Sequence, residues 1–140
     1  MSDRNFPDEC LRGIQGEDKV EGLLVDTDVF NDWNRSQGEE TLEQSINWND
    51  DGGAVELTLS QCKQDGSLKH RGGIAVVPIE RLDSICRGGF WKGILTYERA
   101  ELENNEYHGN LRVSADVPKR ARKQLAAALA VHVTRVIPQD

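Results

Sequence analysis

The sequence has no apolar run long enough to cross a membrane. Its longest apolar stretches are Ile74–Ile79 and Leu125–Val131, whereas a membrane-spanning helix needs about 20 residues. The first nine residues contain neither the basic segment nor the apolar core of a secretory signal. We therefore expect a cytoplasmic protein that does not contact membranes.

Cysteine is scarce and scattered. The chain contains three cysteines, Cys10, Cys62 and Cys86, and no C-x-x-C motif. An odd number of distant cysteines is not the pattern of a disulfide-bonded secreted domain. None of them lies within four residues of another cysteine or of a histidine, which is the spacing that zinc sites favour. We expect free thiols, no metal site and no cofactor.

Sequence signatures of catalysis and of nucleotide binding are also missing. Neither phosphate-binding pattern, G-x-x-x-x-G-K-[ST] or G-x-G-x-x-G, occurs in the chain. The G-x-S-x-G turn that carries a nucleophilic serine is absent as well. The sequence leaves enzymatic activity open, but it defines no set of catalytic residues.

Charge is uneven along the chain. The formal net charge is −7, with 16 acidic and 5 basic residues in 1–66 but 8 acidic and 12 basic residues in 67–140. An acidic protein is a poor partner for nucleic acid, because neutralised phosphates supply most of that affinity. The simpler interpretation of the split is a solvated acidic surface. The sharper interpretation is a pair of faces of opposite sign that orient a protein partner.

The pattern of apolar residues predicts one α+β domain over 1–140. We expect a peripheral or loosely ordered segment at 1–16, containing a short helix over 6–13. Strands are predicted from alternation and turn residues at 20–26, 42–48, 55–59, 68–79, 90–102 and 107–115. A helix over 117–133, capped by Asp116, ends the chain. This order predicts an antiparallel β-meander of about five to six strands, with a long C-terminal helix packed on one face.

The first turns of the C-terminal helix are strongly basic. They contain Lys119, Arg120, Arg122 and Lys123, close to the end of the helix where its dipole is already positive. Such a cluster suits a phosphate, an acidic peptide or a carboxylate-rich surface. It would equally suit the acidic first half of this chain, or solvent. These four residues are the candidate partner- or anion-binding site.

The same helix has a wide apolar arc. Beside its expected core stripe runs a second stripe, which consists of Ala126, Ala130 and Val133. Small side chains allow a second copy of the helix to approach closely, so these residues are a candidate self-association face. The alternative is that alanine is present because it favours helix formation.

Several chemically versatile side chains have no assigned role. His70 and His108 could flank a small-molecule cleft or stand exposed on the sheet, and we favour exposure. A cationic neighbour could lower the pKa of Cys86, although free cysteines are more often buried and inert. Trp33 and Trp48 are expected to pack in the core or at its rim rather than to recognise a ligand.

The sequence thus favours a non-catalytic interaction or accessory domain that binds an unidentified protein partner or a second copy. The alternative is a small-molecule binding domain, with or without enzymatic activity, that holds a cavity between the sheet and the C-terminal helix. The order of elements resembles that of helix-grip ligand-binding folds in topology only. A cavity above about 300 Å³ that is lined by aromatic residues and contains His70 would favour this alternative.

Overall fold

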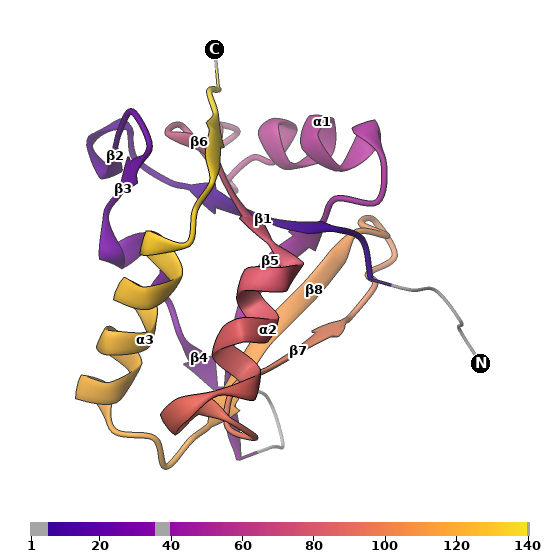
Figure 1. Cartoon of the computed structure of the whole chain (residues 1–140). Coiled ribbons are helices and arrows are strands. Elements are labelled where there is room, and N and C mark those ends of the chain that lie inside the picture. Colours follow the sequence, from indigo (N-terminus) through magenta and orange to yellow (C-terminus); the bar gives the residue numbers. More distant parts are fainter. Residues whose placement is uncertain (1–5, 36–39, 140) are drawn as a thin grey trace.

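An antiparallel sheet with helices on both faces forms the framework of the protein (Figure 1). The structure is a computed structural model and describes residues 6–35 and 40–139. The strands of the sheet lie in the order β7-β8-β5-β1-β6-β9, and the short strand β4 also pairs with β5. Their bounds are Glu9–Ile14 (β1), Asn34–Arg35 (β4), Thr41–Trp48 (β5), Gly73–Pro78 (β6), Thr96–Arg99 (β7), His108–Ser114 (β8) and Arg135–Ile137 (β9).

The helices and a small hairpin complete the chain. The α-helices are α1 (Gly52–Ser60), α2 (Ile79–Arg87) and α3 (Lys119–Val131). Short 3₁₀ helices are η1 (Glu17–Lys19), η2 (Thr27–Phe30) and η3 (Gly89–Trp91), and the hairpin pairs β2 (Val20–Glu21) with β3 (Leu24–Val25). No helix in the described part of the chain is both long and apolar enough to cross a bilayer.

The predicted α+β class is confirmed, together with the antiparallel sheet and the C-terminal helix. The connections between strands are less local than in a simple meander. Among the described strands of the large sheet, only β4–β5 and β7–β8 are neighbours both along the chain and in space. The first strand, β1, lies between β5 and β6 in the middle of the sheet.

The two faces of the sheet have separate cores. The larger core packs the strands against α2 and α3, and its fully buried side chains include Trp48, Leu82, Leu125 and Leu129. The smaller core packs Leu11, Ile74 and Val76 against Ala54 of α1. Because successive strand residues point to opposite faces, adjacent residues such as Cys10 and Leu11 enter different cores.

The expectation of a helical, peripheral N-terminal segment was wrong for residues 9–14. These residues form β1, in which Cys10, Leu11 and Ile14 are almost completely buried. Both faces of β1 are covered, so its apolar residues do not alternate with polar ones. A strand buried on two faces therefore gives no period-two signal in the sequence.

The expected strand over 55–59 is a helix instead. Residues 52–60 form α1, and the carboxylate of Asp51 caps it by accepting a hydrogen bond from the backbone N–H of Gly53 at 2.9 Å. Ala54 and Thr58 lie one helical turn apart and are buried, which accounts for the contact with the sheet. The Asp51 cap and the burial of Ala54 and Thr58 favour a helix here, although the alternation of apolar and polar residues over 55–59 favours a strand.

The C-terminal helix begins later than expected and has a different cap. Its N-cap is Pro118, which forms no side-chain cap hydrogen bond. Asp116 instead accepts a hydrogen bond from the Ser114 hydroxyl at 2.5 Å. The helix is held by packing, because Leu125, Ala126 and Leu129 are fully buried in the larger core.

Candidate functional site

Strands β1 and β5 separate within the sheet and leave an opening between them. They pair only at Cys10–Trp48 and Leu11–Asn47. Beyond that point β1 continues along β6, whereas the far end of β5 pairs with β4. The middle of β5 therefore has no strand partner on this edge, and its backbone groups there need other hydrogen bonds.

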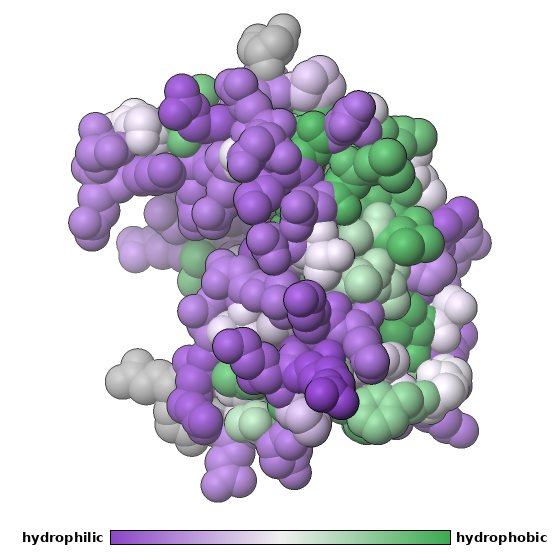
Figure 2. All heavy atoms as spheres, turned by 90° about the vertical axis from the view of Figure 1, so that its left-hand side faces the viewer, coloured by the Kyte–Doolittle hydropathy of each residue, from purple (hydrophilic) through white to green (hydrophobic). Residues whose placement is uncertain are grey.

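A polar cleft of about 630 Å³ lies over this opening. Its walls are the C-terminal end of α1 with the segment that follows it, the turn between β7 and β8, and the residues after η2. Figure 2 shows hydrophilic side chains around an indentation in the outline of the molecule. Amide and hydroxyl side chains dominate the lining, among them Asn34, Ser45, Asn47, Thr58, Gln61 and Asn104.

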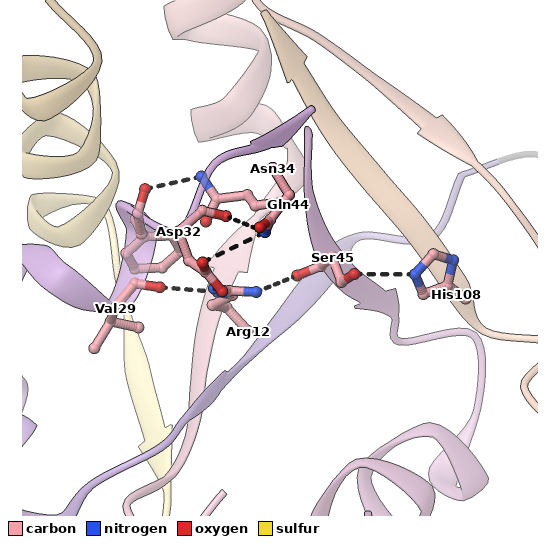
Figure 3. Close-up of polar contacts among 8 residues, drawn as sticks. Arg12, Val29, Asp32, Asn34, Gln44, Ser45 and His108 are labelled. Atoms are coloured by element: carbon pink, nitrogen blue, oxygen red, sulfur yellow. Dashed lines mark hydrogen bonds and ion pairs between the residues drawn. The ribbon is translucent and has the colours of Figure 1, made fainter. Parts of the chain in front are cut away.

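The side chain of Arg12 spans the opening between the strands (Figure 3). Its Nε donates to the carbonyl oxygen of Val29 at 2.8 Å, and its Nη1 donates to the carbonyl oxygen of Ser45 at 2.7 Å. Its Nη2 lies 3.6 Å from the carboxylate of Asp32. The guanidinium thus provides a hydrogen-bond donor for the Ser45 carbonyl of β5, which has no partner on β1 because the two strands separate there. Burial lowers the pKa of Arg12, but the group stays protonated at neutral pH.

Asp32 is held at the rim of the cleft by a second residue. The Asn34 amide donates to the backbone carbonyl of Asp32 at 3.2 Å and to its carboxylate at 3.4 Å. On the other side of the opening, the Gln44 amide donates to the carbonyl of Phe30 at 2.8 Å. Side chains from β1 and β5 therefore anchor the segment 29–34 to the opening.

His70 is buried in the wall of the cleft, contrary to the expectation that it is exposed. Only 7% of its surface is accessible, and its Nε2 lies 3.0 Å from the Oε1 of Gln61. An amide oxygen only accepts hydrogen bonds, so Nε2 carries the proton and Nδ1 is a bare acceptor. That Nδ1 has no hydrogen-bond partner among the described residues. Burial, aided by the charges of Lys69 and Arg12, lowers the pKa of His70 to about 4.

His108 lies across the cleft floor on β8 and contacts Ser45 on β5 (Figure 3). Its Nδ1 lies 2.8 Å from the carbonyl oxygen of Ala100, and its Nε2 lies 3.2 Å from the Oγ of Ser45. Leu111 and Val113 of the same strand are buried in the larger core. His108 has the opposite parity and points away from that core, as its position in the sequence predicts.

The predicted basic cluster lies outside the cleft, at the start of α3. Lys119, Arg120 and Lys123 are exposed, and the half-buried Arg122 donates from Nε to the Val117 carbonyl at 3.4 Å. Within residues 6–35 and 40–139, none of the four forms an ion pair. The structure therefore gives no support to pairing between this cluster and the acidic first half of the chain.

The predicted self-association stripe is partly inside the protein. Ala126 is fully buried and Val133 retains 8% of its accessible surface, both within the larger core. Ala130 is half-buried against the same core. The helical pattern placed Ala126 and Val133 on a face for a second copy, and this was wrong because their own chain already covers them. The exposed apolar residue of this helix is Val131.

The other candidate residues have structural surroundings. Trp48 is completely buried and its indole N–H donates to the Glu98 carbonyl at 3.1 Å, which confirms a core role, while Trp33 is half-buried. Burial raises the pKa of the Cys86 thiol to about 11, so the thiol is not activated. The cysteines are free, and no group of three metal-ligating side chains occurs in the described part of the chain.

Sequence reasoning missed the residues that shape the cleft. Arg12 carried the clearest signal, because it is a charged residue in the interior of β1, next to the buried Leu11. Ser45 gave no signal, since its partner His108 is 63 positions away. Ser60, which also lines the cleft, begins an S-x-x-K spacing with Lys63, but its hydroxyl donates to the Leu57 carbonyl at 2.9 Å.

The cleft can offer a ligand both kinds of hydrogen-bonding group. Arg12 and Lys69 are cationic donors, Asp32 is an acceptor, and the amides act as either. This chemistry fits a polar molecule that forms many hydrogen bonds. Comparison of the chain with models of protein families, with curated proteins and with solved structures finds no match.

Proposed function

We propose that the protein is a small-molecule binding domain whose ligand occupies the cleft over the β1–β5 opening. The observation that carries this proposal is a cleft of about 630 Å³ in which both Arg12 and His70 are held by hydrogen bonds. Ligand sites in proteins have volumes of about 300–1,000 Å³. Positioning a nearly buried cation and a buried, neutral histidine in such a cleft costs solvation energy, and a bound ligand would make use of both.

The charges in the cleft favour a ligand with a carboxylate group. The protein has a net charge of −7, whereas among the described residues the cleft lining contains Arg12 and Lys69 against one carboxylate, that of Asp32. The 3.6 Å separation between Arg12 Nη2 and Asp32 is longer than a charge-assisted hydrogen bond. A ligand carboxylate could therefore take the place of Asp32 at this nitrogen. The remaining amide and hydroxyl groups suit hydroxyl or amide groups on the ligand.

This site differs in position and lining from the one that the sequence suggested. The cleft is bordered by α1, whereas the sequence suggested a cavity between the sheet and the C-terminal helix. Among the described residues, its lining contains no phenylalanine, tyrosine or tryptophan. Recognition would therefore depend on hydrogen bonds rather than on stacking.

The proposal can be tested by titrating the ¹⁵N-labelled protein with N-acetyl amino acids and small hydroxy acids. We expect shifts of amide resonances around Ser45, Gln61 and Asn104 for at least one of these compounds. Ser45→Phe should fill the cleft and abolish the shifts. Ser84→Phe is the matched control, because Ser84 is exposed on α2 and outside the cleft. The absence of shifts with every compound at millimolar concentration would contradict the proposal.

A second candidate function is an interaction domain that uses the basic start of α3. The observation in its favour is that Lys119, Arg120 and Lys123 are exposed, with no ion pair to the described residues. A cationic surface of this kind attracts acidic partners, and salt screens the attraction. Lys119→Glu/Arg120→Glu should weaken binding to a polyglutamate peptide and flatten its salt dependence. Lys92→Glu, an exposed change elsewhere, serves as the control.

A further inference from the structure

Ser45 and His108 form a hydrogen-bonded pair that faces the cleft. Ser45 is exposed on β5, and His108 is half-buried on the neighbouring strand β8. Their Oγ and Nε2 atoms lie 3.2 Å apart, and both residues belong to the lining of the cleft. A hydroxyl within hydrogen-bond reach of an imidazole nitrogen is the arrangement that activates a serine nucleophile.

The backbone fixes the tautomer that such activation requires. The Nδ1 of His108 lies 2.8 Å from the carbonyl oxygen of Ala100, and a carbonyl oxygen only accepts hydrogen bonds. Nδ1 must therefore carry the proton. In the neutral imidazole this leaves the lone pair of Nε2 directed at Ser45, whose hydroxyl donates to it. The Ala100 carbonyl thus positions His108, as the third group of a catalytic triad does.

A positive charge lies beside the same serine. The Arg12 guanidinium donates to the backbone carbonyl of Ser45 at 2.7 Å (Figure 3). It is itself fixed by its hydrogen bond to the Val29 carbonyl. A preorganised cation in the lining of the same cleft can stabilise the negative charge that develops on the oxygen of a substrate carbonyl.

We propose that Ser45 and His108 are a nucleophile and general base that hydrolyse esters of small polar carboxylic acids in the cleft. The proposal rests on the proposed function, because it requires that the cleft bind a small polar molecule. It assigns a reaction class that the sequence left open.

The reaction has two balanced steps. The Oγ of Ser45 attacks the ester carbonyl carbon as its proton passes to Nε2 of His108. The ester C–O bond breaks, and the leaving alcohol takes that proton, so that an acyl-serine remains. Water then attacks the acyl group and gives a proton to His108, which returns it to Ser45 as the carboxylic acid is released. No oxidant, metal or other co-reactant is needed.

Covalent labelling with diisopropyl fluorophosphate, followed by intact-mass measurement and peptide mapping, tests the pair. We expect one adduct per chain, located at Ser45, since the serine oxygen forms a bond to phosphorus as fluoride leaves. Ser45→Ala should abolish labelling, and His108→Gln should slow it at least tenfold. Ser84→Ala, which alters an exposed serine on α2, should be labelled like the parent. The rate of p-nitrophenyl acetate hydrolysis should rank the proteins in the same way: the parent and Ser84→Ala fastest, His108→Gln slower and Ser45→Ala slowest.

The outcomes separate this inference from the proposed function. No adduct, or an adduct on another serine, would overturn the Ser45–His108 pair. If N-acetyl amino acids still shift the amide resonances of the cleft in that case, the binding function stands. Ser45 is exposed, so we expect Ser45→Ala to fold like the parent, and its urea midpoint checks this. An unchanged rate of ester hydrolysis in Ser45→Ala would also contradict the inference.

Discussion

The imidazole of His70 covers Gly13 so closely that a Cβ at position 13 would lie 2.0 Å from Nδ1. Gly13 is part of β1, and His70 precedes the turn into β6. The absence of a side chain on one strand thus provides the space for a buried histidine in the cleft wall.

Gly13→Ala should destabilise the protein. The new methyl group must displace the His70 ring, which Gln61 holds at 3.0 Å, and overpacking of this kind costs about 1–3 kcal/mol. Urea unfolding measures the change. Gly52→Ala is the control, because a Cβ there meets no atom within 4 Å. Equal stability of Gly13→Ala and the parent would show that the ring does not occupy this position.

His70 should make the protein less stable in mild acid. Its pKa is about 4 in the folded protein, against an ordinary value of 6.5. Above about pH 6.5, His70 is unprotonated in both the folded and the unfolded state. Its protonation therefore does not change the free energy of unfolding in this range. As the pH falls from 6.5 to 4, the unfolded chain binds the proton and the folded protein does not. The free energy of unfolding should therefore fall by about 1–3 kcal/mol over this range.

Comparison of urea unfolding for the parent and His70→Gln isolates this contribution. Carboxylates and His132, whose pKa burial also lowers, contribute equally to both proteins. We expect a smaller loss of stability between pH 6.5 and pH 4 in His70→Gln. If the free energy of unfolding falls equally with pH in the two proteins, the lowered pKa of His70 is contradicted.

Arg12→Lys should weaken the opening between β1 and β5 although it keeps the charge. A lysine ammonium has three N–H donors on one nitrogen, so it cannot occupy both of the positions from which Nε and Nη1 of Arg12 donate to the carbonyls of Val29 and Ser45. A buried carbonyl without a donor costs about 1–3 kcal/mol. Arg120→Lys, an exposed change on α3, should leave the urea midpoint unchanged. A similar midpoint for both variants would contradict the spanning role of Arg12.

The ion pair between Arg99 and Asp50 should contribute much more to stability than a surface pair. The two side chains are 9% and 13% accessible, and Arg99→Met would leave the Asp50 carboxylate buried without this partner. Removing one partner of a buried pair costs about 3–5 kcal/mol. Lys19→Met, which breaks the exposed pair with Asp28, should not change the melting temperature measurably. Comparable melting temperatures for the two variants would argue against this difference.

Self-association through α3 stays a prediction, and Val131 is the residue with which to test it. Val131 is 76% exposed, whereas Ala126 is buried in its own protomer. Figure 2 shows apolar side chains gathered on its right-hand side, toward the front of Figure 1, where α2 and α3 lie. If the chain forms a dimer through this face, Val131→Glu should convert it to a monomer in size exclusion with light scattering. A dimer that persists would exclude this face.

Local sequence patterns were enough to predict two of the elements. The alternation in 107–115 corresponds to β8, and the apolar arc in 117–133 corresponds to α3. Both elements present one face to a single core, so burial imposes a period that is visible in the sequence. The α+β class followed from these elements and from the turn residues between them.

Tertiary packing decided the elements that the sequence assigned wrongly. β1 is buried on both faces and therefore has no alternation to detect, while α1 depends on the Asp51 cap and on the contact of Ala54 with the sheet. For the C-terminal helix, the sequence showed a wide apolar arc. Only the fold decided that Ala126 and Val133 face their own core and that Val131 faces solvent.

The sequence by itself determined the composition, the charge split and the side chains available for chemistry. Only the tertiary structure decided which of those side chains meet. Ser45 and His108 are 63 positions apart, and Arg12 and Ser45 are 33 positions apart. They come together because β1 leaves β5 within the sheet while β8 stays paired with it. A divergence between two strands depends on long-range backbone pairing, and no local pattern of residues encodes it.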